Sequence, residues 1–197
     1  MKLNKLLVTC LIVQLTTFQS YSQSRIRDYG VSVGLFKTGK LNAITDVPGV
    51  KVGHKTIIEG EDIRTGVTAI IPHEGNLFKK KTPAAIFVGN GFGKLAGSTQ
   101  VAELGNIETP VILTNTLSVP VALDALISYT LSQPDAQNIA SVNGIVGETN
   151  DGGLNNIRAR RITQEDVLEA ISTADANNVQ EGCVGAGTGT ICFGYKG

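Results

Sequence analysis

The amino-acid sequence predicts a mixed α/β fold. Short runs rich in β-branched residues alternate with turn-forming residues, which is typical of strands. Two longer stretches instead place apolar residues three and four positions apart, as the buried face of a helix requires. With 197 residues, of which 42% are hydrophobic, the chain is long enough to bury one good core. No linker, low-complexity tract or repeat divides residues 23–197.

Six runs are predicted to be strands because turn-forming residues flank each of them. In chain order they are Val31–Phe36, Val50–Ile58, Gly66–Pro72, Ala84–Val88, Val111–Thr114 and Ala140–Val146. The segment Gly182–Gly197 also has β character, since glycines alternate there with small or β-type residues. A glycine-rich strand of this kind lets another backbone or a ligand come close.

Three stretches are predicted to be helical. Val119–Leu131 has an apolar face, and Thr163–Ala174 opens with Thr163 and Asp166 at the spacing of a capping box. The third, Phe92–Leu104, contains Gly97, and an internal glycine disfavours a helix.

The first 22 residues are predicted to be a signal peptide. Lys2 and Lys5 form a positive start, Leu6–Leu15 is apolar, and the small residues Ser20 and Ser22 precede a cut at Gln23. The alternatives are a buried N-terminal helix or a membrane anchor, but the apolar run is shorter than the ~20 residues that span a bilayer. We therefore expect export to the periplasm or the medium.

The charge pattern argues against nucleic-acid and membrane partners. The sequence has 17 basic and 17 acidic residues, and its longest run of like charge is Lys79–Lys81. Nucleic acids and anionic membranes attract proteins through basic patches, and no such patch is evident here.

Two cysteines remain after the predicted cut, Cys183 and Cys192. We expect both to be buried free thiols, with a disulfide between them as the alternative in an oxidising compartment. Neither has a histidine or second cysteine at metal-ligand spacing, so no metal site is predicted.

Two familiar catalytic patterns fail on spacing. Gly89–Lys94 has three residues between its outer glycines rather than the four of a Walker loop, and Leu95 follows the lysine. We expect a tight turn between a strand and a helix there, or backbone amides lining a pocket. His54 and His73 have no Gly-x-Ser-x-Gly partner, and each is expected at a strand end with backbone partners.

The densest polar cluster is Gly147–Gly153, directly after an apolar run. A carboxylate there, at the end of a strand, is well placed to hold a substrate ammonium. Spacing alone favours the alternative, an Asx-turn in which Asn150 and Asp151 cap the backbone.

Several segments together resemble one family, the D-aminopeptidase (DmpA) and β-peptidyl aminopeptidase family. The resemblance covers essentially Gly39–Gly197, with all segments in the family's order. They are Leu41–Val50 followed by Val52–His54, Arg64–Thr68, Val88–Gly97, Gly147–Leu154 and Gly185–Gly189.

This resemblance implies a four-layer α/β/β/α sandwich in a precursor that cuts itself before a serine. That serine becomes the nucleophile of a second polypeptide, with its own amine as base. The implied activity removes N-terminal residues from small peptides, amides or esters. The family assembles as homo-oligomers, and no metal or organic cofactor is implied.

Carried over by position, Glu148 matches the acid that meets the substrate amine. Asn150 falls where the family has a tyrosine that helps the oxyanion, and an asparagine there has a shorter reach.

The nucleophile is expected beyond Gly197, in a C-terminal β-subunit-like segment, so no catalytic residue is assigned within this chain and the sandwich is expected to be incomplete at the C-terminus. The serines that do not match the nucleophile motif are Ser98, Ser118, Ser128 and Ser141.

Two alternatives remain. One is a non-catalytic member that binds small amines or a partner chain. The other is kinship with the ornithine acetyltransferase type of autoprocessing enzyme, which would have a threonine at the cut.

Overall fold

A computed structural model of the chain describes residues 24–177, 179–192 and 194–196. The predicted signal peptide, residues 1–22, lies outside the described residues. The chain divides into two compact units, residues 1–37 and 38–197, and each is described by itself.

In the first unit, the described residues contain one short 3₁₀ helix, η1 (Ile26–Tyr29). The predicted strand at Val31–Phe36 is wrong. A strand needs a neighbouring backbone to pair with, and no strand is assigned among the described residues of this unit. Phe36 is 91% exposed.

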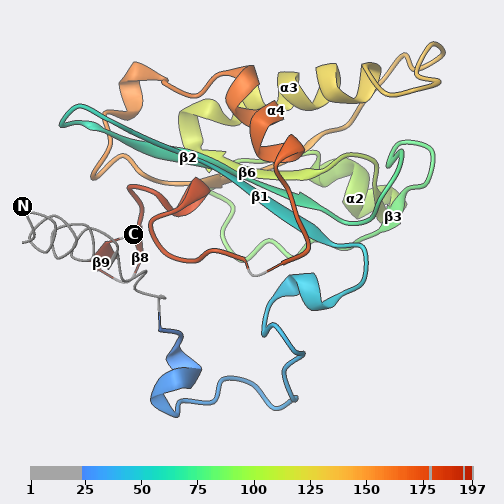
Figure 1. Cartoon of the computed structure of the whole chain (residues 1–197). Helices are drawn as coiled ribbons and strands as arrows, with labels where there is room; N and C mark the ends of the chain where they lie inside the picture. The colour runs from blue at the N-terminus through green and yellow to red at the C-terminus, as the bar shows by residue number, and fades with distance from the viewer. Residues whose placement is uncertain (1–23, 178, 193, 197) are drawn as a thin grey trace, which may run out of the picture. The chain divides into compact units, whose positions relative to one another are not determined.

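The second unit is built on a five-stranded sheet with the order β1-β2-β6-β7-β4 (Figure 1). The β6–β7 pair is parallel and the other neighbours are antiparallel. The strands are β1 (Lys51–Glu59), β2 (Ile63–Ile71), β4 (Leu95–Ala96), β6 (Val111–Asn115) and β7 (Ile145–Thr149).

Two helices, α3 (Val119–Leu131) and α4 (Gln164–Ser172), cover one face of this sheet (Figure 1). The predicted bounds of α3 are confirmed. The predicted capping box of α4 is also confirmed, because Thr163 Oγ1 accepts from Asp166 N at 3.3 Å and Asp166 Oδ2 accepts from Thr163 N at 2.9 Å. The main core lies between helices and sheet; its members include Ile57, Val67, Ala69, Ile112, Ala122, Leu126, Val146 and Val167.

A glycine-rich segment lies against the opposite face of β1 and β2. Gly66 makes this approach possible, since a Cβ atom there would lie 2.2 Å from the carbonyl oxygen of Gly185. Gly182–Gly197 is therefore a site of close backbone approach, as predicted, but it is not one strand. It contains the 3₁₀ turn η5 (Gly185–Gly187) and two short paired strands, β8 (Ile191–Cys192) and β9 (Tyr195–Lys196).

The predicted helix Phe92–Leu104 is shortened to α2 (Ser98–Leu104). Gly97 stands before it with φ of +79°, a left-handed conformation that interrupts a helix, and the two residues before Gly97 form β4 instead. A second, small core joins α2 to the sheet through Val101, Ile107 and Ile145.

Two predicted strands differ strongly from the observed ones. The prediction of a strand at Ala84–Val88 is wrong, because none of these residues is in a strand; the nearest is β3 (Thr82–Pro83), which pairs with β5 (Asn106–Ile107). The strand predicted at Ala140–Val146 begins at Ile145, because its parallel partner β6 begins at Val111 after Pro110. The N–H of Ile145 is bonded instead to the hydroxyl of Thr109, at 3.2 Å.

Three further 3₁₀ turns complete the assigned elements: η2 (Ile44–Asp46), η3 (Thr116–Ser118) and η4 (Ile157–Ala159). Among the described residues, no helix combines the length and the apolar character of a membrane span.

Candidate active site

Glu148 lies near the end of β7, with its side chain 15% exposed. Because β6 and β7 are parallel, their C-terminal ends meet at the same sheet edge, and Thr116 follows β6 there. The antiparallel strand β4 brings its N-terminal end to the same place. Lys94, just before β4, has its Nζ 3.4 Å from Glu148 Oε2 and its carbonyl oxygen 3.0 Å from Glu148 N.

These neighbours keep the Glu148 carboxylate charged. Burial alone would raise its pKa, but the nearby Thr116 hydroxyl and the backbone and ammonium of Lys94 together hold the pKa below its usual range. Neither Glu148 Oε2 nor Thr116 Oγ1 has a well-formed hydrogen bond within the described chain. The carboxylate therefore has unused capacity to accept a hydrogen bond.

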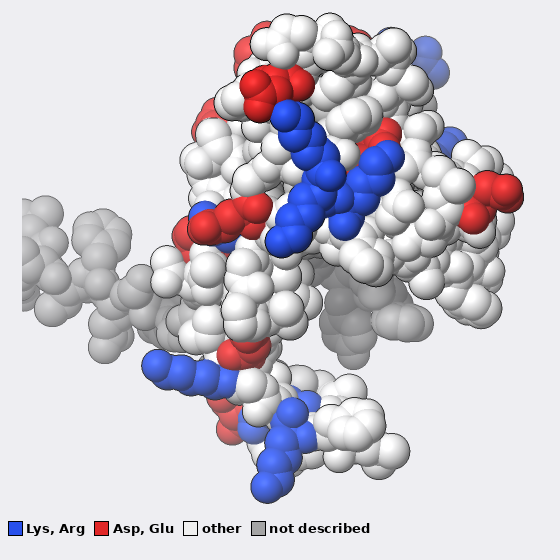
Figure 2. All heavy atoms as spheres, turned by 90° about the vertical axis from the view of Figure 1, so that its right-hand side faces the viewer, with Lys and Arg blue, Asp and Glu red and all other residues white. Residues whose placement is uncertain are grey.

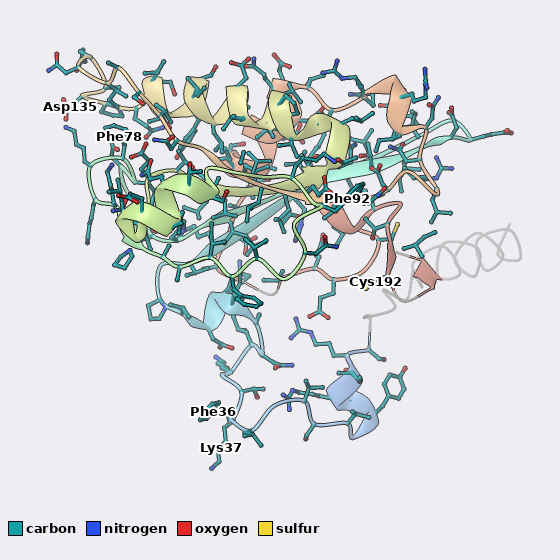
Figure 3. All side chains as sticks on the ribbon, turned by 180° about the vertical axis from the view of Figure 1, so that it is seen from behind. Phe36, Lys37, Phe78, Phe92, Asp135 and Cys192 are labelled. Atoms are coloured by element: carbon teal, nitrogen blue, oxygen red, sulfur yellow. The ribbon has the colours of Figure 1, made fainter. Side chains whose placement is uncertain are left out.

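The glycine-rich loop Gly89–Lys94 packs beside this carboxylate. A Cβ atom on Gly93 would lie 3.5 Å from Glu148 Oε1. Phe92, labelled in Figure 3, is 85% exposed, and its ring centroid lies 5.3 Å from the Lys94 ammonium. The expected turn from strand to helix is wrong, because no strand is assigned at the residues directly before this loop and β4 follows it.

Asn150 is exposed, and its Oδ1 accepts from the N–H of Gly152 at 3.0 Å. This is the Asx-turn that was the alternative interpretation of the cluster. Asn150 therefore has only its Nδ2 group left as a donor toward a substrate. The neighbouring Asp151 is 1% exposed, and its Oδ1 has no hydrogen-bond partner in the described chain.

The two histidines differ. Both ring nitrogens of His73 lie 2.7 Å from backbone carbonyl oxygens, those of Glu74 and Lys80, so the expected backbone partners are confirmed. His54 lies inside β1 rather than at its end, and its Nδ1 is 2.9 Å from Thr68 Oγ1. Burial lowers the pKa of His54. The sequence pattern missed this contact because Thr68 is on the neighbouring strand.

Cys183 and Cys192 are free and exposed (Cys192 is labelled in Figure 3), so the prediction of buried thiols is wrong. In the described part of the chain, no three His, Cys, Asp or Glu side chains gather in a group that could hold a metal ion.

Charged residues of both signs share the face shown in Figure 2. Lys79 pairs with Asp135 at 2.9 Å, and Lys81 pairs with the buried Glu108.

Comparison with known proteins agrees with this architecture. The chain is 39% identical over 183 residues to the β-peptidyl aminopeptidase BapA of Sphingosinicella microcystinivorans, covering 88% of this chain and 45% of that protein. A Burkholderia β-aminopeptidase superposes with a TM-score of 0.84 at 41% identity, covering 88% of this chain and 50% of the other. A third similar protein is the L-aminopeptidase D-Ala-esterase/amidase of Ochrobactrum anthropi, described as a variant of the Ntn hydrolase fold. It superposes with a TM-score of 0.79 at 35% identity, covering 88% of this chain and 50% of the other.

These similarities confirm the predicted fold class, an α/β fold of the DmpA type. Among the described residues, two helices and a five-stranded sheet form two of its layers. The chain spans about half the length of the relatives it matches. Residues 42–197 match the sequence profile of peptidase family S58, and the chain belongs to that family.

Proposed function

We propose that this chain supplies the amine-binding part of an aminopeptidase, in which Glu148 accepts the ammonium group of the substrate's N-terminal residue. The observation that carries this proposal is the charged, largely buried carboxylate at the end of β7, whose Oε2 has no well-formed hydrogen bond among the described residues. A cation meeting a carboxylate in such a place is attracted more strongly than in bulk water.

Lys94 gives this site a way to exchange partners. Its side chain is 51% exposed, so the ammonium can leave Glu148 and remain hydrated when a substrate ammonium arrives. The carboxylate is then paired both with and without substrate, and it avoids the high cost of a buried charge without a partner.

The reaction class follows from the family. Relatives are named β-peptidyl aminopeptidase and L-aminopeptidase D-Ala-esterase/amidase, which supports small peptides, amides or esters as substrates. We place the nucleophilic serine in a β-subunit-like segment after Gly197. Its hydroxyl would attack the substrate carbonyl while its own free amine accepts the proton. Asn150 Nδ2 is then a candidate donor to the developing oxyanion.

The serines of this chain have other surroundings. Ser118 is buried where α3 begins, and Ser128 Oγ donates to Gln164 Oε1 at 3.4 Å. Among the described residues, no hydrogen bond joins a serine hydroxyl to a histidine ring or to Glu148. This supports a nucleophile from another segment. We also propose, from the sequence pattern and the family, that the protein is exported and assembles as a homo-oligomer.

The test is Glu148→Gln, measured with this chain and the β-subunit-like segment together. Hydrolysis of an amino-acid p-nitroanilide should lose about 10- to 100-fold in kcat/KM, since a hydrogen bond to a charged group contributes ~1.5–3 kcal/mol. The control is Glu103→Gln, an exposed glutamate on α2, which should leave kcat/KM unchanged. An unchanged kcat/KM for Glu148→Gln would contradict the assignment. Amine binding without turnover in the parent would favour the non-catalytic alternative.

A further inference from the structure

Among the described residues, no strand pairs with the outer edge of the sheet at His54. Strand β1 lies at the end of the strand order and has β2 on one side only. On its other side Val52 forms an antiparallel bridge with Asp175, with N···O distances of 2.9 Å and 3.1 Å. In an antiparallel ladder, alternate residues direct their backbone groups to the same side. The N–H and C=O of His54 therefore point away from β2, as those of Val52 do.

The pairing between β1 and the segment that contains Asp175 ends after this single bridge for a physical reason. Continuing the antiparallel register would bring Thr173 opposite His54, but Thr173 is the C-cap of α4, and its N–H bonds to Glu169 O at 3.0 Å. The chain has left the sheet there and turned into a helix. Within the described chain, neither backbone group of His54 has a hydrogen bond.

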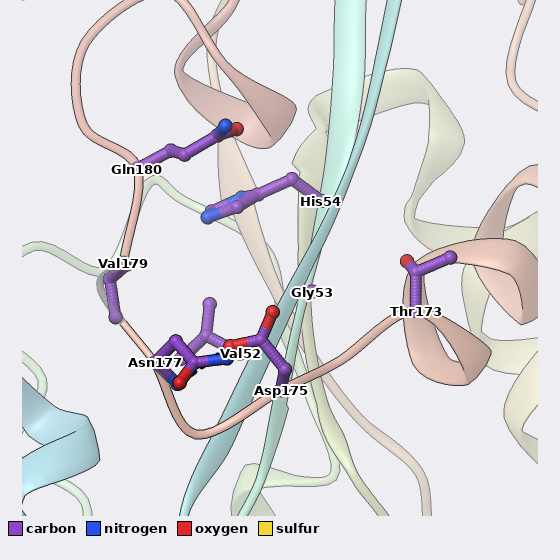
Figure 4. Close-up of a pocket in the computed structure, with 8 residues that line it drawn as sticks. All are labelled: Val52, Gly53, His54, Thr173, Asp175, Asn177, Val179 and Gln180. Atoms are coloured by element: carbon purple, nitrogen blue, oxygen red, sulfur yellow. Dashed lines mark hydrogen bonds between the residues drawn. The ribbon is translucent and has the colours of Figure 1, made fainter.

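A pocket of about 210 Å³ lies at this open edge (Figure 4). It is smaller than the ~300–1,000 Å³ of pockets for drug-sized ligands, so only part of a peptide that pairs with the edge of β1 would lie inside it. The side-chain amides of Asn177 and Gln180 can donate to and accept from a peptide group. The lining residues are Val52, Gly53, His54, Thr173, Asp175, Asn177, Val179 and Gln180.

The imidazole of His54 lies at the wall of this pocket. Its Nδ1 is 2.9 Å from Thr68 Oγ1, which also accepts from Ala186 N at 3.0 Å. A hydroxyl both donates and accepts, so this contact suits either tautomer of the ring. Nε2 is buried and has no partner in the described chain. The exposed Gln180 side chain runs alongside the ring in Figure 4, and its displacement would open a path to Nε2.

We propose that this pocket binds a short peptide in an extended conformation, which pairs with the backbone N–H and C=O of His54 and lengthens the ladder begun by Asp175. Addition of a strand to an open sheet edge is a recurrent mode of peptide binding. The recognised group is the peptide backbone, not a free amine. The site shares no residue with the Glu148 site and does not depend on the function proposed there.

The test uses the full chain and the blocked peptide acetyl-Val-Ala-Val-amide. This probe has no free amine and so cannot engage Glu148 as a substrate would. We expect a saturable change in the ¹H–¹⁵N resonance of His54, with a Kd on the order of 1 mM, and slower exchange of its amide hydrogen. Each amide nitrogen of the peptide is then methylated in turn. Binding should weaken about tenfold only when the methylated nitrogen is the one that pairs with His54.

Two protein variants check the same contact. His54→Ala keeps the backbone N–H and should retain most of the binding, whereas His54→Pro removes the N–H and should abolish it. Proline is tolerated where an edge N–H points outward, and Ile58→Pro, on the same edge but outside the pocket lining, is the matched control. If His54→Pro fails to fold, the methylated peptides decide the question alone.

Three results would overturn the proposal. The first is that all methylated peptides bind equally well. The second is that the peptide changes the resonances around Glu148 rather than around His54. The third is that ethylammonium alone binds and that Asp175→Asn abolishes this binding, which would indicate a cation site. Glu148→Gln should leave the peptide affinity unchanged, so failure of this proposal and failure of the proposed function are distinguishable.

Discussion

Helix α4 packs against β1 so closely at Gly53 that no side chain fits between them. A Cβ atom on Gly53 would lie 2.0 Å from the carbonyl oxygen of Ala170 and 2.9 Å from the N and Cα atoms of Ala174. All three are backbone atoms, so no side chain can rotate away. In Gly53→Ala the end of α4 must retreat by roughly 1 Å or more, since protein interiors have few voids to absorb an added methyl group.

The expected cost is about 3 kcal/mol or more. Overpacking a core usually costs ~1–3 kcal/mol, and moving the end of α4 also strains the two Val52–Asp175 hydrogen bonds, each a net ~1 kcal/mol. Urea unfolding followed by circular dichroism should show a lower midpoint with an unchanged slope. The control is Gly91→Ala, where the added methyl meets open space and the backbone angle is ordinary. If Gly53→Ala lowers the free energy of unfolding by less than about 1 kcal/mol, and by no more than the control does, the reasoning is refuted. Overpacking a core should cost more unfolding free energy than a surface substitution does.

Two other predictions concern stability at low pH and catalysis. Burial would raise the pKa of Glu108, but its bonds to Lys81, Asn143 and Gln100 outweigh that effect and place the folded-state pKa below 4.5. Glu108 therefore stabilises the fold above pH 4.5, and this contribution is lost as the pH falls below 4.5 toward the folded-state pKa. In Glu108→Gln the unfolding free energy should accordingly depend less on pH below 4.5. The 197-residue chain alone should not hydrolyse an amino-acid p-nitroanilide, and turnover above a mock purification would locate a nucleophile within it.

The elements that the sequence predicted correctly are those whose determinants are local. The capping box of α4 uses two residues three positions apart, and the apolar face of α3 repeats within one helix. Glu148 was placed at a strand end because an apolar run directly precedes it. Each of these signals lies within a short window of sequence.

The errors concern elements that depend on distant partners. Where β7 begins is decided by the position of Val111 on β6. Val31–Phe36 has the composition of a strand, but it has no pairing partner among the described residues of its unit. The contact between His54 and Thr68 likewise follows from the pairing register of two strands. No periodicity within one segment encodes such information.

The candidate amine site owes its geometry to strand direction. Thr116 follows β6, Glu148 lies near the end of β7 and Lys94 precedes β4. These three positions converge only because β6 runs parallel to β7 while β4 runs antiparallel to it. Glu148 is thus attached to a strand with a hydrogen-bonded neighbour on each side, and Thr116 and Lys94 lie next to the ends of those two neighbouring strands. This attachment fixes the charged group before substrate arrives. Binding then loses less free energy, because the residues of the site do not have to be ordered first.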